Sequence, residues 1–503
     1  MKRLAKRTAV FGFLYSARGL RRALVAAPQA DKLVRPGFEA MLWRIGMWRL
    51  WLLYEDACKD VPAYRTIWAE HGRPAVAVNG LEPDFSALPV TDKESYVKRF
   101  SVEERCRDGR IPSRGVVIDE SSGTSGEPNN WVRGAAERDD GRKLLHLGMH
   151  RNFGHQQLFV INAFALGPWA TGMNVSMSMV DVSILKSTGP DIQKIVNTLR
   201  QFGPAYRYLI CGYPPFLKRL VDSEEIDLSE YDVLAAVGGE GMSEALRDYL
   251  LRSFKRVYSS FGASDLEINI AAENDFTIAL RRLLRDRPEL GEALGLPQHA
   301  LPMVFQYNPL DYYIESTDDG ELVISVCRLD SLSPKIRYNI HDAGRVIRFP
   351  ELKRALALFG LAPQALDERW IDLPLLFHYG RSDATVAFYG ANIAPADVEE
   401  AVFSIPELQS VVSSFALIPG EEDAEKTLTL AFELAAGRDA PANANDLRAV
   451  LHERLIGVNQ DYREASRFIP EGREPAVEFH AAETGPFAGY DIRLKRAYIK
   501  QRP

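Results

Sequence analysis

The chain has few cysteines and no long run of apolar residues. Only four of its 503 residues are cysteine, and they lie far apart at Cys58, Cys106, Cys211 and Cys327. This spacing excludes a zinc ribbon or a disulfide framework. Because no run of about 18 uncharged apolar residues is present, we expect no membrane-spanning helix. With no secretory signal or disulfide pattern, we expect a cytoplasmic protein.

The overall composition is that of an ordinary globular protein. Hydrophobic residues make up 46% and charged residues 26% of the chain. This length is sufficient for about two to four domains with buried cores. The net charge of −7 gives no reason to expect nucleic acid as a partner.

Positive charge is concentrated in residues 1–50. This segment carries eleven Lys or Arg against Asp31 and Glu39, so its charge is +9 and that of the remainder is −16. Apolar residues, among them Phe11 and Phe13, lie between the basic ones. A signal peptide fits poorly because the apolar stretch is short. The alternatives are an amphipathic helix that contacts anionic lipid as a peripheral membrane segment, or a helix packed on the protein with a solvated basic face. We favour the packed helix.

Strand and helix patterns alternate along the middle of the chain. Buried strands are expected near residues 158–164, 207–211 and 233–237, with helices between them, which favours an α/β fold with a largely parallel sheet. Residues 320–347 look like a turn-rich β region. After residue 381 the order helix, strand, strand, helix indicates a small α+β module. We therefore divide the chain into a basic N-terminal helical segment (1–60), a large domain (61–380) and a C-terminal domain (381–503).

A loop of small and hydroxyl residues follows the strand expected to end at Asp119. Residues 121–128 read Ser-Ser-Gly-Thr-Ser-Gly-Glu-Pro. Glycines and small side chains let backbone N–H groups approach a polyphosphate closely. The Gly-Lys-Ser/Thr ending of a Walker A loop is missing. A flexible surface loop is the alternative, but the position directly after a strand favours phosphate binding.

Three further segments follow in order. Residues 238–242 read Gly-Gly-Glu-Gly-Met after an expected strand, and residues 261–265 read Phe-Gly-Ala-Ser-Asp. Residues 337–344 read Arg-Tyr-Asn-Ile-His-Asp-Ala-Gly. The longest pattern, residues 379–399, contains Gly-Arg-Ser-Asp and then Gly-Ala-Asn-Ile-Ala-Pro-Ala-Asp-Val-Glu.

Taken in this order, the segments resemble the motifs of the adenylate-forming superfamily, which includes acyl-CoA synthetases, peptide-synthetase adenylation domains and luciferases. The phenylacetate–CoA ligase-like branch is the most similar, because residues 61–65 read Val-Pro-Ala-Tyr-Arg. The resemblance implies a large N-terminal domain of parallel-sheet α/β layers plus a β-rich subdomain. A small, mobile α+β C-terminal domain would follow it.

The resemblance also implies a nucleotide site. Phe261 would stack on adenine, and Asp342 would accept hydrogen bonds from both ribose hydroxyls. Ser264 would bind a phosphate and Asp265 would hold Mg²⁺ through a hard oxygen. The implied ATP- and AMP-binding residues are Ser121, Ser122, Gly123, Thr124, Ser125, Gly126, Gly239, Glu240, Phe261, Gly262, Asp342 and Arg381.

Other roles implied by the resemblance concern the acyl group and the C-terminal domain. Asp383 would be the hinge and Gly390 would lie along the pantetheine channel. Lys495 would be the adenylation lysine, with Lys500 and Arg493 as substitutes; a basic solvated tail is the alternative for this segment. The implied acyl pocket contains Asn162, Phe164, Trp169 and Tyr213, which on periodicity alone would be core residues.

The sequence departs from the family pattern at three points. Asn129 stands where the phosphate loop normally has a lysine, and Asp265 replaces a glutamate that is one methylene longer. Glu267, two residues on, is a substitute metal ligand. The usual Gly-Lys signature near the C-terminal end is absent.

The implied activity is activation of an aryl or fatty carboxylic acid by ATP, followed by transfer to coenzyme A. The expected cofactors are therefore ATP, Mg²⁺ and coenzyme A, and the expected partner is a small carboxylic acid. Transfer to a carrier-protein thiol, an amine or another small nucleophile is one alternative. A degenerate nucleotide-binding relative with weak activity is another. A homodimer is one alternative for the assembly of the chain.

Overall fold

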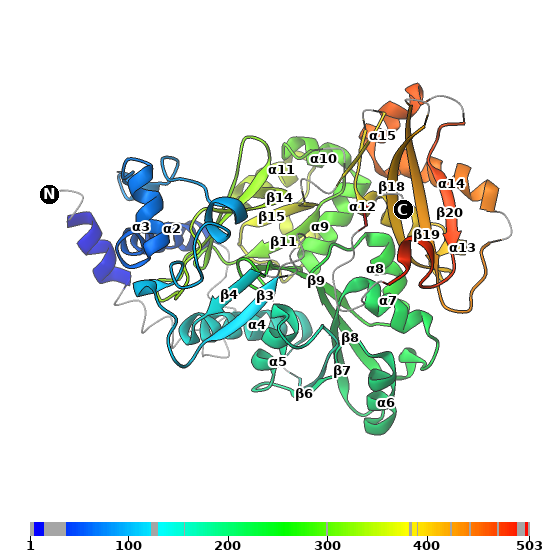
Figure 1. Ribbon diagram of the computed structural model, residues 1–503, viewed down its shortest axis with the longest axis horizontal. Helices are drawn as coiled ribbons and strands as arrows, with labels where there is room; N and C mark the ends of the chain where they lie inside the picture. Colours follow the sequence, from blue (N-terminus) through cyan, green and yellow to red (C-terminus); the bar gives the residue numbers. More distant parts are fainter. Residues whose placement is uncertain are drawn as a thin grey trace.

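A large N-terminal domain and a smaller C-terminal domain make up the fold (Figure 1). The computed structural model describes residues 5–14, 37–121, 129–154, 156–297, 300–381, 385–389, 391–422, 425–441, 444–469, 472–489 and 498–500. Among these residues, no helix combines the length and the apolar character that crossing a bilayer requires.

One mixed sheet forms the centre of the large domain. Eleven described strands follow the order β12-β13-β14-β15-β11-β10-β9-β8-β7-β5-β6. Five of them pair in parallel, and the strands predicted near residues 158–164, 207–211 and 233–237 are among them. These are β5 (Leu158–Asn162), β6 (Ile184–Ser187), β7 (Arg207–Gly212), β8 (Asp232–Gly238) and β9 (Val257–Phe261). The α/β prediction for this part is confirmed.

Helices follow these strands in the order of a parallel α/β unit. Helix α6 shows why the local sequence folds this way: Asp191 caps its first turn by accepting the Lys194 N–H at 3.0 Å, and Gly203 ends it with φ +74°. The helices of this half are α4 (Ala135–Phe153), α5 (Ala170–Met179), α6 (Ile192–Phe202), α7 (Pro214–Asp222) and α8 (Glu244–Leu250).

The β-rich region is the antiparallel half of the same sheet. The two-residue strand β10 (Ala271–Ala272) pairs with β9 on one side and with β11 on the other, which joins the two halves. We predicted separate parallel and β-rich parts, and the structure shows one continuous sheet. The remaining strands are β11 (Met303–Tyr307), β12 (Tyr312–Ser316), β13 (Glu321–Val326), β14 (Tyr338–Ile347) and β15 (Leu375–Arg381).

Three helices of this half were not predicted: α9 (Asp275–Asp286), α10 (Pro288–Ala293) and α11 (Phe349–Leu358). They share a buried apolar cluster with β11 and β15, to which Phe276, Leu352 and Phe377 belong. Two small hairpins lie outside the large sheet, β1 (Ala77–Asn79) with β2 (Glu82–Asp84), and β3 (Val117–Ser121) with β4 (Asn129–Arg133).

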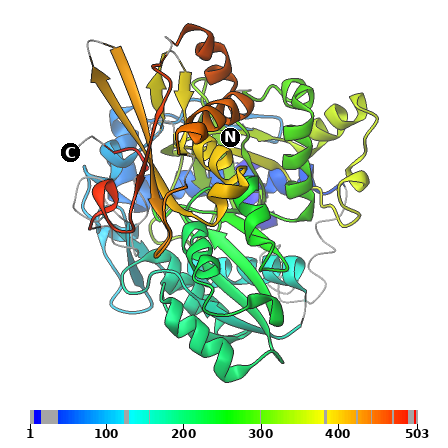
Figure 2. The same cartoon turned by 90° about the vertical axis from the view of Figure 1, so that its right-hand side faces the viewer.

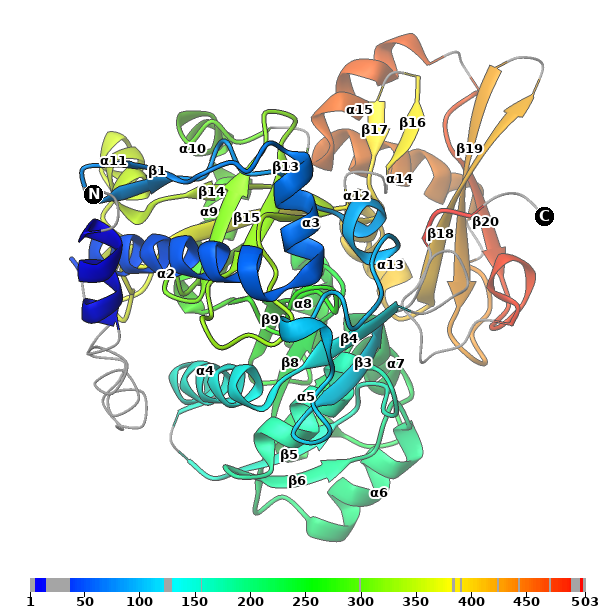
Figure 3. The same cartoon turned by 60° about the vertical axis from the view of Figure 1, so that its left-hand side comes forward.

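The N-terminal segment is part of the large domain's core. Helices α2 (Glu39–Asp60) and α3 (Pro62–Glu70) contact each other (Figure 3). Helix α2 also contacts β12. A helix over residues 5–14 buries Val10 and Leu14 in one apolar cluster with side chains of α2 and α3. Arg7 of this helix binds Glu55 and Asp56. The favoured interpretation, a helix packed on the protein, therefore agrees with the structure for residues 5–14.

The C-terminal domain contains a three-stranded sheet covered by helices. Strand β18 (Val412–Glu422) pairs antiparallel with β19 (Glu425–Leu434), which pairs in parallel with β20 (Ala476–His480). Figure 2, which looks onto this domain, shows β18 and β19 side by side in orange. A hairpin of β16 (Val386–Phe388) and β17 (Ala391–Ile393) comes first. The helices are α12 (Pro395–Phe403), α13 (Pro406–Gln409), α14 (Ala444–Val458) and α15 (Gln460–Ala465).

Helix α12 is the first of the two helices predicted after residue 381. Pro395 occupies the first helical turn, where its missing N–H costs no hydrogen bond. The Asp397 carboxylate accepts the N–H of Ala394 at 2.8 Å and also the side-chain amide of Asn459 at 2.7 Å. Helix α12 is thereby fixed to α15 within the C-terminal domain.

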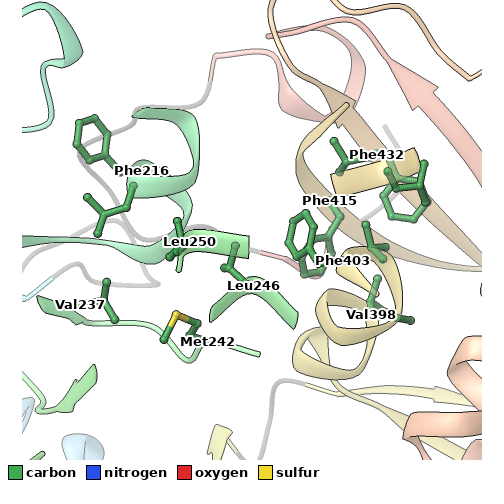
Figure 4. Close-up of a cluster of buried hydrophobic side chains, with 14 of the residues drawn as sticks. Phe216, Val237, Met242, Leu246, Leu250, Val398, Phe403, Phe415 and Phe432 are labelled. Atoms are coloured by element: carbon green, nitrogen blue, oxygen red, sulfur yellow. The ribbon is translucent and has the colours of Figure 1, made fainter. Parts of the chain in front are cut away.

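The two domains share one hydrophobic cluster. Met242, Leu246 and Leu250 from the large domain lie in it together with Val398 and Phe403 from α12 (Figure 4). Each side chain of this size removed from water contributes roughly 1.5–3 kcal/mol. The contact between α8 and α12 is therefore a substantial part of the stability of the domain arrangement.

Two carboxylates of α12 lie at the N-terminal end of α8. Glu399 accepts the N–H of Ser243 at 2.6 Å, and Glu400 accepts the N–H of Ala245 at 3.0 Å. These N–H groups have no partner inside their own helix, and the helix dipole favours negative charge there. Burial raises the pKa of Glu399 to about 7, although the Ser243 N–H opposes this; the nearby Glu240 and Glu400 carboxylates raise it further.

We expect this buried carboxyl group to make stability depend on pH. Its folded pKa lies above its usual value near 4.5, so the native state binds the extra proton and the free energy of unfolding falls as pH rises through about 7. Glu399→Gln keeps an acceptor for Ser243 but cannot ionise. The variant should match the wild type at pH 5 and exceed its free energy of unfolding by roughly 1–2 kcal/mol at pH 8.5, measured with denaturant.

The exposed Glu407 on α13 provides the matched control. Glu407→Gln should leave the difference between pH 5 and pH 8.5 unchanged. A Glu399→Gln variant that is less stable than the wild type at pH 8.5 would contradict the burial argument.

Candidate active site

The predicted phosphate loop is flanked by the β3–β4 hairpin. Ser121, the last residue of β3, pairs with Asn129, the first of β4. Ser122, Gly123, Thr124, Ser125 and Gly126 lie in residues 122–128, outside the described residues. The hairpin shows where the loop begins and ends. The phosphate-binding role of the loop stays a prediction.

Cations hold the stem of this hairpin in place. The Trp131 side chain on β4 is 1% exposed, and the Arg105 guanidinium and the Lys335 ammonium lie 5.3 and 5.0 Å from its ring centroid. Burial, with the charge of Arg133, lowers the pKa of Lys335 to about 7. Its ammonium donates to the carbonyl and hydroxyl of Ser333 at 2.9 and 3.0 Å.

Arg133 connects the hairpin to the second predicted motif. Its guanidinium donates to the Asp119 carboxylate at 3.3 Å and to the backbone carbonyls of Ser264 and Leu266. One side chain thus ties both strands of the hairpin to the loop after β9. The predicted phosphate ligand Ser264 therefore lies beside the stem of the predicted phosphate loop.

The loops after β8 and β9 lie next to each other. Gly238 at the end of β8 is in register with Ser260 on β9, so residues 239–242 and 262–265 leave adjacent parallel strands at their carboxyl ends. In open α/β sheets, ligands bind in the crevice outside these carboxyl ends. The structure therefore brings together the two segments that were predicted to bind adenosine and phosphate.

A buried ionic network lies under these two loops. Arg247 on α8 binds Glu244 at 3.0 Å and Glu273 at 2.5 Å, and Glu273 also accepts the Ser259 N–H on β9 at 2.7 Å. Arg281 on α9 binds Glu244 at 2.9 Å. Although burial alone would raise the pKa of Glu244, the arginines around it lower it to about 2. The network joins α8, β9 and α9 through paired buried charges.

Gly239 and Gly262 permit close packing in the two loops. Gly239 has φ +83°, and a Cβ there would lie 2.5 Å from Cε1 of Tyr213. A Cβ at Gly262 would lie 2.5 Å from the backbone nitrogen of Asn269. Both positions therefore require glycine.

The predicted adenine and ribose residues meet at a histidine that the sequence did not indicate. His378 on β15 lies 2.9 Å, Nε2 to Oδ2, from Asp342 on β14, and its ring centroid is 4.7 Å from that of Phe261. Asp342 is also in register with Arg381, the exposed last residue of β15. The pairing of β14 with β15 is what brings these residues together.

Phe261 is more deeply buried than an open stacking surface would be. Its side chain is 7% exposed, and its ring also lies 6.0 Å from Phe305. The imidazole of His378 covers part of it. The predicted adenine contact therefore stays a prediction, with His378 as an added neighbour.

Asp265, the predicted metal ligand, is oriented by a buried tyrosine. Tyr338 on β14 donates its hydroxyl to Asp265 at 3.1 Å, and burial raises the pKa of that hydroxyl. The substitute ligand Glu267 is bound instead by Arg328 and by the Tyr312 hydroxyl. Of the two carboxylates, Asp265 is therefore the better candidate for Mg²⁺.

Tyr64 explains the motif near the start of the large domain. Its hydroxyl accepts the Ile336 N–H at 2.8 Å and lies 3.3 Å from the Pro334 carbonyl. The tyrosine of the Val-Pro-Ala-Tyr-Arg segment thus fixes the chain just before Tyr338 and Asp342.

The predicted acyl-pocket residues divide into two groups. Phe164 and Tyr213 contact each other with ring centroids 5.1 Å apart, and Tyr213 lies against Gly239. Trp169 forms a backbone bridge with Glu120, next to the phosphate-loop stem. These three therefore surround the same region as the nucleotide residues.

Asn162 does not face a pocket. It is fully buried, its amide nitrogen donates to the Gly172 carbonyl at 2.7 Å and to the Ser176 hydroxyl at 2.8 Å, and its oxygen accepts the Phe164 N–H. Its polar groups are thus used to shape the turn before α5. The prediction that Asn162 lines the acyl pocket is corrected on this ground.

A cavity of about 240 Å³ lies between the β3–β4 hairpin, α4 and α5. Its wall carries three arginines and three aspartates, among them Arg142, which binds Asp139 at 2.6 Å and also Asp181. Among its described lining residues, none belongs to the predicted nucleotide or acyl sets. Because these charges largely pair with one another, we do not assign the acyl group to this cavity.

Several predicted residues of the C-terminal domain lie outside the described residues: Asp383, Gly390, Arg493 and Lys495. Lys500, the substitute for Lys495, is described. Its ammonium donates to the Pro486 carbonyl and lies 5.0 Å from the Phe487 ring centroid, within the C-terminal domain.

Comparisons with known proteins give a distant relative in sequence and solved structures of similar fold. No family model matches the chain. The chain is 24% identical to phenylacetate-coenzyme A ligase of Pseudomonas putida over 371 residues, which cover 71% of this chain and 74% of that protein.

Solved structures with a similar fold include 2-hydroxyisobutyryl-CoA ligase. In its postadenylation state, bound to R3-HIB-AMP, the TM-score is 0.64 with 15% identity over 91% of this chain and 88% of that one. In its thioesterification state, bound to 2-HIB-AMP and CoA, the TM-score is 0.54 with 16% identity over 94% and 92%. The chain thus has the fold of the adenylate-forming ligases. The predicted resemblance to that superfamily is confirmed, and phenylacetate-coenzyme A ligase is a distant relative.

The contact between Gly239 and Tyr213 gives a test of the loop geometry. Gly239→Ala places a Cβ against the Tyr213 ring and forces a side chain into a positive φ, so we expect the free energy of unfolding to fall by about 1–3 kcal/mol. Gly241→Ala is the matched control, because a Cβ there meets no atom within 4 Å. If both variants unfold at the same denaturant concentration, the loop geometry is wrong.

Proposed function

We propose that the chain activates a carboxylic acid with ATP and then transfers the acyl group to coenzyme A. The observation that carries this proposal is the meeting of Phe261, Asp342 and His378 beside the loops at the carboxyl ends of β8 and β9. An aromatic ring and a carboxylate held together at such a crevice suit the base and the ribose of a nucleotide.

In the first step, a carboxylate oxygen of the acid attacks the α-phosphorus of ATP. The bond from that phosphorus to the bridging oxygen breaks, and pyrophosphate leaves. The loop at residues 121–126 and Ser264 would hold the phosphates. Lys495 would stabilise the charge that develops on the acid and the α-phosphate.

The ligands of Mg²⁺ would come partly from this chain and partly from the nucleotide. Among the described residues, no group of three His, Cys, Asp or Glu side chains is arranged to hold a metal ion by itself. Mg²⁺ usually takes one or two carboxylates together with substrate phosphates, and Asp265 offers one oriented carboxylate. When bound, the ion would neutralise charge on the leaving pyrophosphate.

In the second step, the thiol of coenzyme A attacks the acyl carbonyl of the adenylate. The carbon–sulfur bond forms, the bond to the phosphate oxygen breaks, and AMP leaves. Rotation of the C-terminal domain about Asp383 would bring Gly390 to the pantetheine arm. The Pseudomonas putida relative is a coenzyme A ligase, which supports coenzyme A as the acceptor.

The direct test is pyrophosphate release with a panel of aryl and fatty acids, with and without coenzyme A. We expect at least one acid to release pyrophosphate with ATP and to give its coenzyme A thioester. Pyrophosphate release without thioester would indicate a carrier-protein thiol or an amine as the acceptor. Absence of pyrophosphate release with every acid would contradict the proposal and favour a degenerate nucleotide-binding relative.

A single substitution tests the ribose contact. Asp342→Asn keeps an acceptor for His378 but removes the charge that would bind two ribose hydroxyls, so we expect KM for ATP to rise about 10- to 100-fold with a smaller change in kcat. Asp319→Asn, in an exposed turn, is the matched control and should leave both constants unchanged. An unchanged KM in Asp342→Asn would remove Asp342 from the nucleotide site.

A further inference from the structure

The last described segment of the chain is fixed to the C-terminal sheet. Tyr498 and Lys500 pair with Leu417 on β18: the Leu417 N–H donates to the Tyr498 carbonyl at 2.7 Å, and the Lys500 N–H donates to the Leu417 carbonyl at 3.0 Å. The Tyr498 ring stacks on Phe415 with centroids 4.8 Å apart. The position of Tyr498 is therefore set by the C-terminal domain.

The hydroxyl of Tyr498 crosses to the large domain. It donates to the Glu240 carboxylate at 3.0 Å. Glu240 directly follows Gly239 in the loop after β8. The adjacent strand β9 ends at Phe261, and the loop after it carries Asp265. A hydrogen bond to an ionised acceptor is stronger than one between neutral groups. The C-terminal domain thus contacts the predicted nucleotide loop through a side chain that the sequence did not single out.

The same loop is held at two further points by the C-terminal domain. Glu399 accepts the Ser243 N–H and Glu400 accepts the Ala245 N–H. Residues 240–245 therefore form three hydrogen bonds with residues of the C-terminal domain, one as acceptor and two as donors. Any rotation of that domain has to break or exchange all three.

We propose that Tyr498 is a positioning residue that couples the nucleotide loop to the orientation of the C-terminal domain. Tyr498 holds Glu240 only in the present orientation of the C-terminal domain. In that orientation it favours the loop conformation that binds the adenosine part of the nucleotide. Since such coupling is reciprocal, bound nucleotide favours this domain orientation by the same factor. This inference rests on the proposed function for its consequence in the reaction, but the coupling itself concerns nucleotide binding alone.

The test compares two tyrosines that each lose one hydroxyl. Tyr498→Phe removes the bond to Glu240 but keeps the ring on Phe415. Tyr462→Phe is the matched control: its hydroxyl lies 2.8 Å from Nδ1 of His452, inside the C-terminal domain. AMP affinity is measured by calorimetry on the full chain. We expect Tyr498→Phe to weaken AMP binding about 5- to 10-fold and Tyr462→Phe to leave it unchanged.

A double-mutant cycle with Glu240→Ala, which deletes the acceptor, ties the effect to this hydrogen bond. Each single variant should weaken AMP binding, and the double variant should bind about as well as the weaker single one, because both remove the same interaction. Unfolding midpoints of Tyr498→Phe and Tyr462→Phe should be similar. That result would separate a positioning role from a loss of overall stability.

Each outcome bears on the inference. AMP binding by Tyr498→Phe that equals the wild type, or additive effects of the two substitutions, would overturn it. If AMP binding weakens as expected but no acid releases pyrophosphate, the coupling stands and the proposed function fails. If acids are activated and Tyr498→Phe binds AMP normally, the function stands and the coupling fails. A wild type that does not bind AMP would overturn both.

Discussion

The arrangement of the site depends on the ionic network buried under its two loops. Glu244, Arg247, Glu273 and Arg281 are each at most 3% exposed, yet every one of them has an opposite charge within hydrogen-bond distance. Such networks add little net stability compared with apolar packing, but removing one member leaves an unpaired buried charge, which costs about 3–5 kcal/mol. The network therefore specifies geometry: α8, β9 and α9 are held in one relative position, and the loops after β8 and β9 are held with them.

Much of the site could be predicted from local sequence. The order of the motifs, the start of α12 at Pro395 and the parallel strands β5, β7, β8 and β9 all follow from short-range patterns, and the structure agrees with them. The site residue that was not predicted is placed by pairing between strands that are distant in the sequence. His378 reaches Asp342 and Phe261 only because β15 pairs with β14 across the antiparallel half of the sheet. No local pattern marks a histidine in a buried strand as a neighbour of a nucleotide site.

Polar residues were the other source of error. Asn162 was predicted to face a substrate because its position fits the family's acyl pocket, but both ends of its amide are used by the turn before α5. The sequence analysis gave Glu399 no structural role, because a carboxylate on a helix carries no local sign of burial. In the structure it is buried at the start of α8. In both cases the partner lies in a segment whose position only the folded chain determines.

The domain contact combines two kinds of interaction with different consequences for movement. The apolar cluster around Leu246 and Phe403 is non-directional, so it can tolerate sliding as long as water stays excluded. The three hydrogen bonds from Tyr498, Glu399 and Glu400 are directional and fail after a small rotation. A domain held in this way has a defined orientation, and a change of orientation becomes a switch between discrete states instead of a gradual drift.

The structure also bears on the aspartate at position 265, where the family pattern has a glutamate. Asp265 is one methylene shorter than the usual glutamate, but its carboxylate is oriented by Tyr338, which lies on the same strand as Asp342. Strand β14 therefore carries both the predicted ribose ligand Asp342 and the tyrosine that orients the predicted metal ligand. That strand is itself fixed at its start by Tyr64, which accepts the Ile336 N–H. Asp265 itself lies in the loop after β9, but the hydroxyl that orients its shorter side chain is held by the same strand that carries Asp342.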